Sequence, residues 1–380
     1  MGYIPRAIQP RIEKVLFQGK AIILYGARQV GKTTLLKVIQ HKYTDRSEYL
    51  NCDEPDIRIA LQNKTSTELK RLIGSSRLVL IDEAQRVENI GLTLKLLVDN
   101  FPDTQIIASG SSAIELSDRI VEPLTGRKVE FFLFPFSLSE LLSIYTRLEL
   151  SRLLDSFLIY GLYPNAVLQG NPLDVVTEIA GSYLYRDVLQ YQTVKNSEVL
   201  HRLIQMLALQ AGGEVSYNEL GSALGVDKAT IARYVDLMEK AFIIFHIKPY
   251  SRNLRNELGK KRKIYFVDVG IRNALINNFN PLDLRQDKGA LFENLFISER
   301  TKMNQNTGRR VEGYFWRNYQ GAEIDYLETT AKEIEYYECK WAKQSWNAPI
   351  QFKTTYPHST GHLVNRDNIL DYLLIKDSSK

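Results

Sequence analysis

The chain has 380 residues, more than one hydrophobic core usually serves, so roughly two to four domains are expected. Its hydrophobic content of 44% and charged content of 24% are those of a globular protein, and no apolar run approaches the roughly 18 to 20 residues of a membrane helix. The formal net charge of +5 is mild, so basic residues matter only where they cluster.

The cysteines and residues 1–16 indicate the cellular compartment in which the protein is expected. Two cysteines, Cys52 and Cys339, are too few for a disulfide framework or a four-ligand zinc site. Residues 1–16 mix charged and apolar side chains and lack the apolar core of a secretory signal. These features predict a protein of the cytoplasm, a reducing compartment, without membrane contact.

The first third of the chain alternates apolar, strand-like runs with helical stretches, which predicts a parallel sheet wrapped by helices and an α/β class. The expected strands are 21–25, 48–51, 78–81, 105–108 and 129–133. Residues 136–195 are helical in pattern and are interrupted at Gly161, Leu162, Tyr163 and Pro164, which suggests a helical lid.

The second half suggests two further domains. Residues 197–268 follow a winged-helix order of three helical segments and then two strands around a basic stretch. A helix at 290–302 and strands at 323–327 and 334–340 predict a fourth, α+β unit. The expected domains are therefore a parallel-sheet α/β core at 1–135, a lid at 136–195, a winged helix at 196–270 and an α+β domain at 271–380.

A phosphate-binding motif follows the first expected strand. It matches GxxxxGK[ST] and precedes a helix, and its residues are Gly26, Ala27, Arg28, Gln29, Val30, Gly31, Lys32 and Thr33, with Thr34 next. Glycines let the backbone N–H groups face phosphate oxygens, and the helix start adds partial positive charge. Lys32 is expected to pair with the β- and γ-phosphates of ATP, and the Thr33 hydroxyl to bind Mg²⁺.

The third expected strand ends in two carboxylates, Asp82 and Glu83. Parallel strands deliver such side chains to the ligand crevice at the carboxyl edge of the sheet. We expect Asp82 to hold Mg²⁺ and Glu83 to polarise the attacking water. The fourth strand runs into Ser109, Gly110, Ser111 and Ser112, whose hydroxyls can sense the γ-phosphate or simply form a turn.

These motifs resemble the bacterial and archaeal AAA-type ATPases that carry a C-terminal domain of unknown function, number 4143. The resemblance runs along the whole chain and also includes Thr125-Gly126-Arg127, Phe134-Pro135-Phe136-Ser137, Gly161-Leu162-Tyr163-Pro164, Tyr185-Arg186-Asp187, Leu291-Phe292-Glu293-Asn294 and Phe315-Trp316-Arg317. It implies a five-stranded core with one strand between the two Walker strands. It also implies that Tyr163 and Pro164 lie by the adenine, and that Arg127 or Arg186 stabilises the γ-phosphate from the same or a neighbouring subunit, surface ion pairing being the alternative.

Within the expected winged helix, residues 217–239 predict a helix, a tight turn at Gly225 and a second helix capped by Asp227. The second helix would present Lys228, Thr230, Arg233 and Tyr234 to a DNA major groove. A basic cluster follows that favours phosphate contact, with Lys260, Lys261, Arg262 and Lys263 as the expected DNA-binding residues. The alternative is an internal switch domain whose basic loop is merely solvated.

Acidic residues gather in the last domain. Glu293 lies on the expected helix, Asp325 on one strand, and Glu338 and Lys340 on one face of the next strand. Carboxylates that converge beside a lysine can bind Mg²⁺ and orient water for phosphodiester hydrolysis. The set resembles the PD-(D/E)XK nuclease arrangement, although no proline precedes Asp325. The alternative is a solvated hairpin or a relict nuclease fold without activity.

The fold class expected from the whole sequence is α/β, a P-loop NTPase sheet with a helical lid, followed by a winged helix and an α+β restriction-endonuclease-like domain. The expected activity is ATP hydrolysis with Mg²⁺, coupled to DNA binding or processing. The alternative is a nucleotide-dependent signalling or interaction switch with an inactive nuclease-like domain. A homo-oligomer is a further expectation, since AAA-type relatives often form rings.

Overall fold

The computed structural model describes residues 3–43, 46–111, 123–183, 188, 196–251, 262–331 and 333–374. The chain divides into two compact units. The N-terminal unit comprises Pro5–Pro135 with Lys240–Phe242, and the C-terminal unit comprises Met1–Ile4, Phe136–Glu239 and Ile243–Lys380.

The N-terminal unit is built on a parallel five-stranded sheet with the strand order β2-β3-β4-β1-β5. Its strands are β1 (Ala21–Gly26), β2 (Ser47–Asn51), β3 (Leu78–Asp82), β4 (Gln105–Gly110) and β5 (Lys128–Leu133). Its helical elements are α1 (Gln9–Lys14), α2 (Lys32–His41), α3 (Pro55–Leu61), α4 (Ser66–Ile73), η2 (Ala84–Arg86) and α5 (Ile90–Asn100). The expected α/β sheet, with β4 between the two Walker strands β1 and β3, is confirmed.

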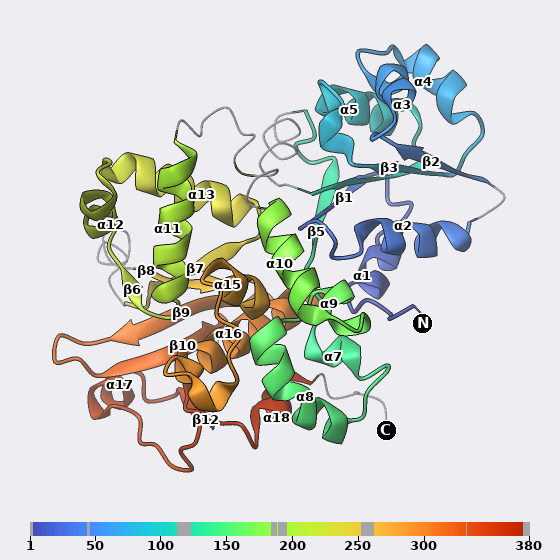
Figure 1. Cartoon of the computed structure of the whole chain (residues 1–380). Helices are drawn as coiled ribbons and strands as arrows, with labels where there is room; N and C mark the ends of the chain where they lie inside the picture. The colour runs from blue at the N-terminus through green and yellow to red at the C-terminus, as the bar shows by residue number, and fades with distance from the viewer. Residues whose placement is uncertain are drawn as a thin grey trace. The chain divides into compact units, whose positions relative to one another are not determined.

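Burial explains why these strands have nearly continuous apolar sequences. Every residue of β1, β3 and β4 is buried, because helices cover both faces of the sheet. Figure 1 shows α3, α4 and α5 on one side of the sheet and α2 on the other. The carboxyl ends of β1, β3 and β4 therefore meet at one edge, where loops can carry polar side chains.

The C-terminal unit begins with helices in the region expected to form a lid. They are α7 (Leu138–Leu141), α8 (Arg147–Tyr160), α9 (Pro164–Leu168) and α10 (Pro172–Tyr183). The break after α8 requires glycine, because Gly161 has φ +74° and a Cβ there would lie 1.9 Å from the Asp268 carboxylate. That carboxylate accepts the N–H of Leu162 at 2.7 Å and also caps α15 (Val269–Leu275). The expected lid helices thus belong to the C-terminal unit and share its core.

Three helices and three strands follow. They are α11 (Ser197–Leu209), β6 (Glu214–Val215), α12 (Tyr217–Leu224), α13 (Lys228–Lys240), β7 (Ile244–Pro249) and β8 (Arg262–Phe266). The remaining elements are η4 (Leu282–Leu284), α16 (Lys288–Thr307), β9 (Glu312–Arg317), β10 (Glu323–Thr329), β11 (Ile334–Cys339), α17 (Ile350–Thr355), β12 (Thr360–Val364) and α18 (Ile369–Leu373). The helices α11, α12, α13 and α16 and the strands β7, β8, β10 and β11 are those expected from the sequence, whereas β6, α15, β9, α17, β12 and α18 were not predicted.

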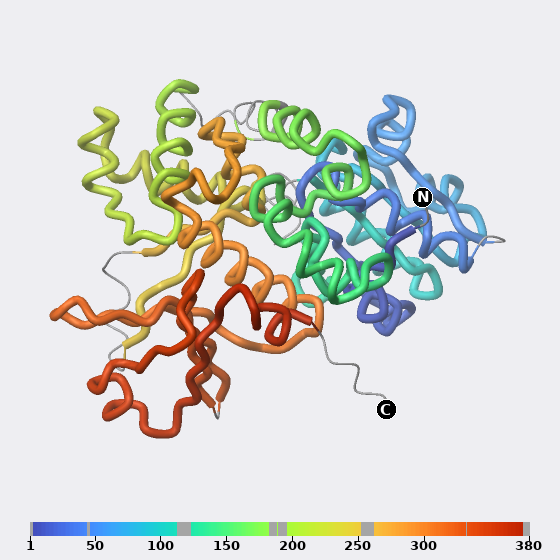
Figure 2. The backbone as a smooth tube through the Cα atoms, turned by 60° about the horizontal axis from the view of Figure 1, so that its bottom comes forward, coloured from blue at the N-terminus to red at the C-terminus, as the bar shows by residue number. Residues whose placement is uncertain are grey.

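One seven-stranded sheet joins the last two expected domains, in the order β12-β11-β10-β9-β7-β8-β6. The joint is a short parallel pairing in which Lys248 and Pro249 of β7 oppose Tyr314 and Phe315 of β9. Figure 1 shows β7 and β8 beside β9, and Figure 2 traces the same yellow and orange segments of the backbone as a tube. The boundary expected at residue 270 therefore falls inside a continuous sheet, because backbone pairing between distant strands leaves no signature in the local pattern.

Within the described residues, no helix is both long and apolar enough to span a bilayer.

Candidate functional site

The P-loop connects β1 to α2 and is shaped by two glycines. A Cβ on Gly26 would lie 2.3 Å from the carbonyl oxygen of Leu133, so only glycine fits where β1 meets β5. Gly31 has φ +95°, in the left-handed region that glycine tolerates, and it starts α2. The loop therefore curls as the motif requires, with the first N–H groups of α2 at its end.

Lys32 lies at this loop. Its ammonium group donates to the carbonyl oxygens of Gly26 and Ala27, both at 2.8 Å, and the residue is only 5% exposed. These contacts keep a buried positive charge against the loop backbone. The expected role of Lys32 in binding phosphate stays a prediction.

Asp82 is the centre of a hydrogen-bonded group at the carboxyl edge of the sheet. Its Oδ2 accepts from the Thr33 hydroxyl at 2.6 Å and from the Tyr49 hydroxyl at 2.7 Å, and its Oδ1 accepts from the Ser109 hydroxyl. The structure thus brings Thr33 and Asp82 together as the sequence predicted. Such hard oxygen ligands are those that Mg²⁺ prefers.

Sequence reasoning missed Tyr49. Burial and the Asp82 carboxylate raise the pKa of its phenol, so the hydroxyl stays protonated and donates. The sequence held a signal for Tyr49. It lies two residues before Asn51 on β2, so both side chains point to the same face, and Asn51 pairs with Asp82 of β3.

Glu83 occupies a left-handed conformation with φ 52°, which is uncommon for a residue other than glycine. Its carboxylate accepts from the Gln85 amide at 2.6 Å, and the same amide lies 3.0 Å from the Ser111 hydroxyl. A buried amide thus connects the expected water-activating carboxylate to the end of β4. The expected sensor residue Ser112 lies outside the described residues.

Arg6 is a second contributor that the sequence did not reveal. Its guanidinium donates to the carbonyl of Val30 in the P-loop and to that of Phe134 after β5, both at 2.6 Å. Arg6 is 5% exposed and therefore ties the loop to the sheet from inside the unit. No motif marks it, since it lies in the first turn before α1.

Arg127 lies elsewhere than expected for a group acting on the same subunit's phosphate. Its backbone carbonyl accepts from the N–H of Ala21, the first residue of β1, whereas the P-loop follows the last residue of that strand. Its side chain pairs with Asp99 at 2.6 Å, and both side chains are partly exposed. The same-subunit role is therefore corrected: Arg127 stands at the amino edge of the sheet. Arg186 lies outside the described residues.

Tyr163 and Pro164 belong to the C-terminal unit. Tyr163 is buried, and it precedes α9, of which Pro164 is the first residue. Their predicted place beside the adenine stays a prediction.

The acidic residues of the C-terminal unit form a second site, here called the carboxylate cluster: Glu293 on α16, Asp325 on β10, Glu338 on β11, and Lys340. The Lys340 amine lies 2.7 Å from Glu338 and 3.6 Å from Asp325. Asp325 also accepts the N–H of Cys339 at 2.8 Å. The expected hairpin therefore brings Asp325, Glu338 and Lys340 together.

Glu293 is contacted by Lys263, which was predicted to bind DNA, and by Tyr265, for which no role was predicted. Lys263 is 3% exposed and pairs with Glu293 at 3.3 Å and with Glu323 at 2.5 Å, while the Tyr265 hydroxyl donates to Glu293 at 2.6 Å. The prediction that Lys263 contacts DNA is corrected, because its amine faces buried carboxylates. Lys263 and Tyr265 alternate on β8, so both face α16.

Burial, and then the charge of Asp325, raise the pKa of Glu293 and of Glu338 to about 7. Burial works against the charge of Lys340, but Asp325 and Glu338 outweigh it and raise the pKa of that amine. Glu338 Oε2 has no hydrogen-bond partner within the described part of the chain. Across the same residues, no three His, Cys, Asp or Glu side chains are grouped closely enough to hold a metal by themselves.

The expected DNA-facing helix is α13. Lys228 and Arg233 are exposed, as expected, but Tyr234 is 1% exposed and packs inside the unit. The major-groove role of Tyr234 is therefore corrected. Arg262 lies with its guanidinium 5.4 Å from the Tyr217 ring, and Lys260 and Lys261 lie outside the described residues.

The parallel sheet order, the P-loop between β1 and α2, and Asp82 at the end of β3 define an AAA-type P-loop NTPase fold. Family models agree with this class: residues 18–142 match an AAA domain, residues 151–282 a domain of unknown function (DUF8612), and residues 288–369 the domain of unknown function DUF4143. The chain thus joins an AAA domain to a C-terminal DUF4143 region, and the resemblance seen in the sequence is confirmed.

The similar curated proteins are themselves uncharacterized. One from Haemophilus influenzae is 27% identical over 83% of this chain and 81% of its own length. Protein MJ1544 of Methanocaldococcus jannaschii is 25% identical over 85% of this chain and 75% of its own length. Among solved structures, AMPPCP-bound DnaA from Aquifex aeolicus is 19% identical, covers 63% of this chain and 89% of its own, and has a TM-score of 0.32.

Proposed function

We propose that the protein hydrolyses ATP at the P-loop and uses its nucleotide state to control DNA binding or processing by the C-terminal unit. The observation that carries the first half is the Asp82 group, in which Thr33 from α2 and Ser109 from β4 share one carboxylate. Glu83 beside it is connected through Gln85 to Ser111, the kind of contact by which a γ-phosphate can be sensed.

Mg²⁺ fits this proposal. Thr33 and Asp82 would hold the ion, whose oxygen preference matches the hydroxyl and carboxylate that already lie 2.6 Å apart. When bound, Mg²⁺ neutralises the charge that develops on the β- and γ-phosphates. Lys32 then supplies a fixed positive charge, and Glu83 orients the attacking water.

Three substitutions test ATP hydrolysis. Lys32→Ala removes the phosphate-facing charge and is expected to abolish ATP binding. Glu83→Gln keeps the hydrogen-bonding shape but removes the base, so hydrolysis is expected to fall by two orders of magnitude or more while ATP still binds. Lys42→Ala is the control, because Lys42 follows the end of the same helix, is half exposed and pairs only with Glu13 among the described residues. Wild-type protein that neither binds nor hydrolyses ATP would refute the proposal.

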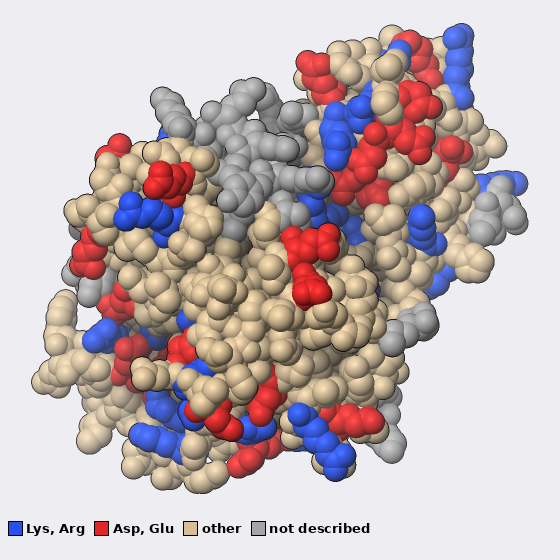
Figure 3. Space-filling model, viewed as in Figure 1, with Lys and Arg blue, Asp and Glu red and all other residues tan. Residues whose placement is uncertain are grey.

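DNA control rests on α13 and its surroundings. Lys228 and Arg233 are exposed there, and α12, α13 and the β7–β8 pair follow a winged-helix order. Figure 3 shows basic and acidic side chains intermixed over the visible face of the C-terminal unit, so a DNA contact on this face would be local. Measuring the ATPase rate with and without DNA tests this coupling, and a rate that is indifferent to single- and double-stranded DNA would favour the signalling or interaction switch.

The carboxylate cluster supports a second candidate function, a nuclease. The observation favouring it is the unpartnered Oε2 of buried Glu338 next to Asp325 and Lys340. Cleavage of plasmid or single-stranded DNA with Mg²⁺ or Mn²⁺ should then be lost in Asp325→Ala and Lys340→Ala and kept in Lys343→Ala, which removes an exposed lysine nearby. Absence of cleavage in the wild type leaves the cluster as an inactive, nuclease-like core.

A further inference from the structure

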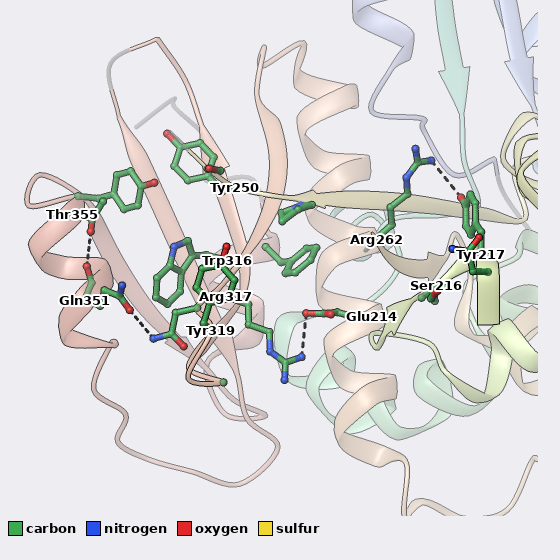
Figure 4. Close-up of a pocket in the computed structure, with 18 of the residues that line it drawn as sticks. Glu214, Ser216, Tyr217, Tyr250, Arg262, Trp316, Arg317, Tyr319, Gln351 and Thr355 are labelled. Atoms are coloured by element: carbon green, nitrogen blue, oxygen red, sulfur yellow. Dashed lines mark hydrogen bonds and ion pairs between the residues drawn. The ribbon is translucent and has the colours of Figure 1, made fainter. Parts of the chain in front are cut away.

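A large hollow, here called the aromatic pocket, lies in the C-terminal unit where the start of α12, the ends of β7 and β9, and α17 approach one another (Figure 4). Its volume is about 870 Å³, within the roughly 300–1,000 Å³ typical of ligand sites. Neither the Walker residues nor the carboxylate cluster line it. Its aromatic lining comprises Tyr217, Tyr250, Phe315, Trp316, Tyr319 and Tyr356.

Two of these rings are braced from behind. The Tyr250 ring lies 5.2 Å from the ring of Tyr356 and 5.2 Å from that of Tyr314, and Trp316 lies 5.2 Å from Phe352 in the core beneath α17. Rings held in this way lose little conformational freedom when a flat ligand stacks on them. Tyr319 differs, because it lies in the β9–β10 turn and is fully exposed. Packing among the described residues therefore does not account for a large aromatic side chain at this position.

Positive charge surrounds these rings. Lys228, Arg262 and Arg317 line the pocket against one carboxylate, Glu214. Arg317 is 44% exposed and lies 3.1 Å from Glu214 on the opposite wall, as Figure 4 shows. The pocket therefore favours a ligand that carries negative charge as well as flat faces.

The pocket continues toward the proposed DNA-facing helix. A second hollow at the turn between α12 and α13 shares Asn218 and Lys228 with it, so the two hollows adjoin. On its other side, Arg317 lies 3.8 Å from Glu323, which pairs with Lys263, and Lys263 in turn contacts Glu293 of the carboxylate cluster. A linear ligand can thus run from α13 across the rings toward the cluster.

We propose that the aromatic pocket binds a single-stranded stretch of nucleic acid, with bases stacked on Tyr250 and Tyr319 and phosphates held by Arg317, Arg262 and Lys228. Stacking accepts any base, and a cationic track accepts any backbone, so the site is sequence-tolerant. A duplex does not fit, because its bases are already stacked inside the helix. The assignment rests on the proposed DNA-linked function and names the form of DNA.

The test uses the full chain and labelled oligothymidylate, followed by fluorescence anisotropy, with a duplex of the same length in parallel. Wild-type protein is expected to prefer the single strand. Tyr319→Ala should weaken oligothymidylate binding about tenfold, because it removes one base–aromatic stack. Arg317→Ala should weaken it by about the same factor, because it removes a phosphate contact. The Tyr319 substitution removes no buried packing, so loss of folding does not explain its effect.

Matched controls lie in the same unit. Arg366→Ala removes an arginine that is 41% exposed, pairs with Asp155 at 2.8 Å and lies over the Trp341 ring, outside the pocket. Leu284→Ala removes another exposed apolar side chain. Both controls should bind oligothymidylate as the wild type does.

The outcomes separate this proposal from the one on which it rests. If DNA changes the ATPase rate and binds equally well to wild type and both pocket variants, the pocket proposal is overturned and the DNA-linked function stands. Preference for duplex also overturns the pocket proposal. If the wild type binds neither DNA form and its ATPase rate ignores both, the DNA-linked function and the pocket proposal fail together.

Discussion

The nucleotide site and the carboxylate cluster hold acidic groups in opposite ways. Asp82 is surrounded by neutral hydroxyl donors from Thr33 at the start of α2, Tyr49 of β2 and Ser109 of β4. The carboxylate cluster also receives the Tyr265 hydroxyl and the Cys339 N–H, but it relies on the ammonium groups of Lys263 and Lys340. The neutral donors around Asp82 can turn to a ligand at little cost in free energy. The carboxylate cluster loses much of its stability when one of its cations is removed.

The largest effect is expected for Lys263→Ala. This change leaves Glu293 and Glu323 without their shared cation, and breaking a buried ion pair costs about 3–5 kcal/mol. Denaturation followed by tryptophan fluorescence measures it, because all 3 tryptophans, Trp316, Trp341 and Trp346, lie in the C-terminal unit. Lys343→Ala, at an exposed position, should change little. A loss below about 1 kcal/mol would mean that the cluster does not depend on Lys263.

The pH dependence of the same fluorescence transition is the next largest effect. Glu293 and Glu338 have pKa values raised from 4.5 to about 7, so the folded unit holds protons that the unfolded chain releases between these values. The free energy of unfolding should therefore fall as pH rises from about 4.5 to 7, by up to roughly 3 kcal/mol per group. In Glu293→Gln the fall should be visibly smaller, and an unchanged slope would contradict the raised pKa.

Arg6→Ala tests how the P-loop of the nucleotide site is held in place. The change removes the guanidinium that donates to the carbonyl groups of both Val30 and Phe134. Leaving these two acceptors unpaired is expected to lower the free energy of unfolding by about 2 kcal/mol. ATP affinity, measured by calorimetric titration, should fall about tenfold because the P-loop loses its tether. Arg6→Lys should lie between, since one amine does not span both carbonyls. Wild-type affinity in Arg6→Ala would show that the loop holds its shape alone.

Arg127→Ala should have the smallest effect on stability. Its ion pair with Asp99 is partly exposed, so about 0.5 kcal/mol is expected. If Arg127 acts on a neighbouring subunit, the variant alone should be a poor ATPase, and mixing it with Lys32→Ala protein should restore part of the activity. Equal ATPase rates in Arg127→Ala and wild type would leave the residue as a surface ion pair.

Much of the nucleotide site could be predicted, because its parts are contiguous in the chain. Gly26 to Thr33 form one loop, and Asp82 and Glu83 end one buried strand. The five strands of that sheet appear where apolar runs predicted them, each within a residue or two. Arg6 and Tyr49 were missed, since each acts through a contact with a distant segment.

The C-terminal unit depended on tertiary structure to a greater degree. The sequence placed Glu293, Asp325 and Glu338 on the right helix and strands. It extended the last strand to Lys340, which lies just after β11, and it assigned Lys263 to a DNA surface and Tyr234 to a groove-facing position. Which face of a strand or helix is buried depends on what packs against it, and for β8 that partner is α16, which follows later in the chain.

By itself, then, the sequence determined the P-loop motif and the strands of the N-terminal sheet, because local spacing specifies both. Only the tertiary structure decided that the β7–β8 pair continues into the C-terminal sheet, that Arg127 stands at the amino edge of the N-terminal sheet, and that an aromatic pocket opens beside Arg317. These features arise from pairing and packing between segments far apart in the chain, where no local pattern records the partner.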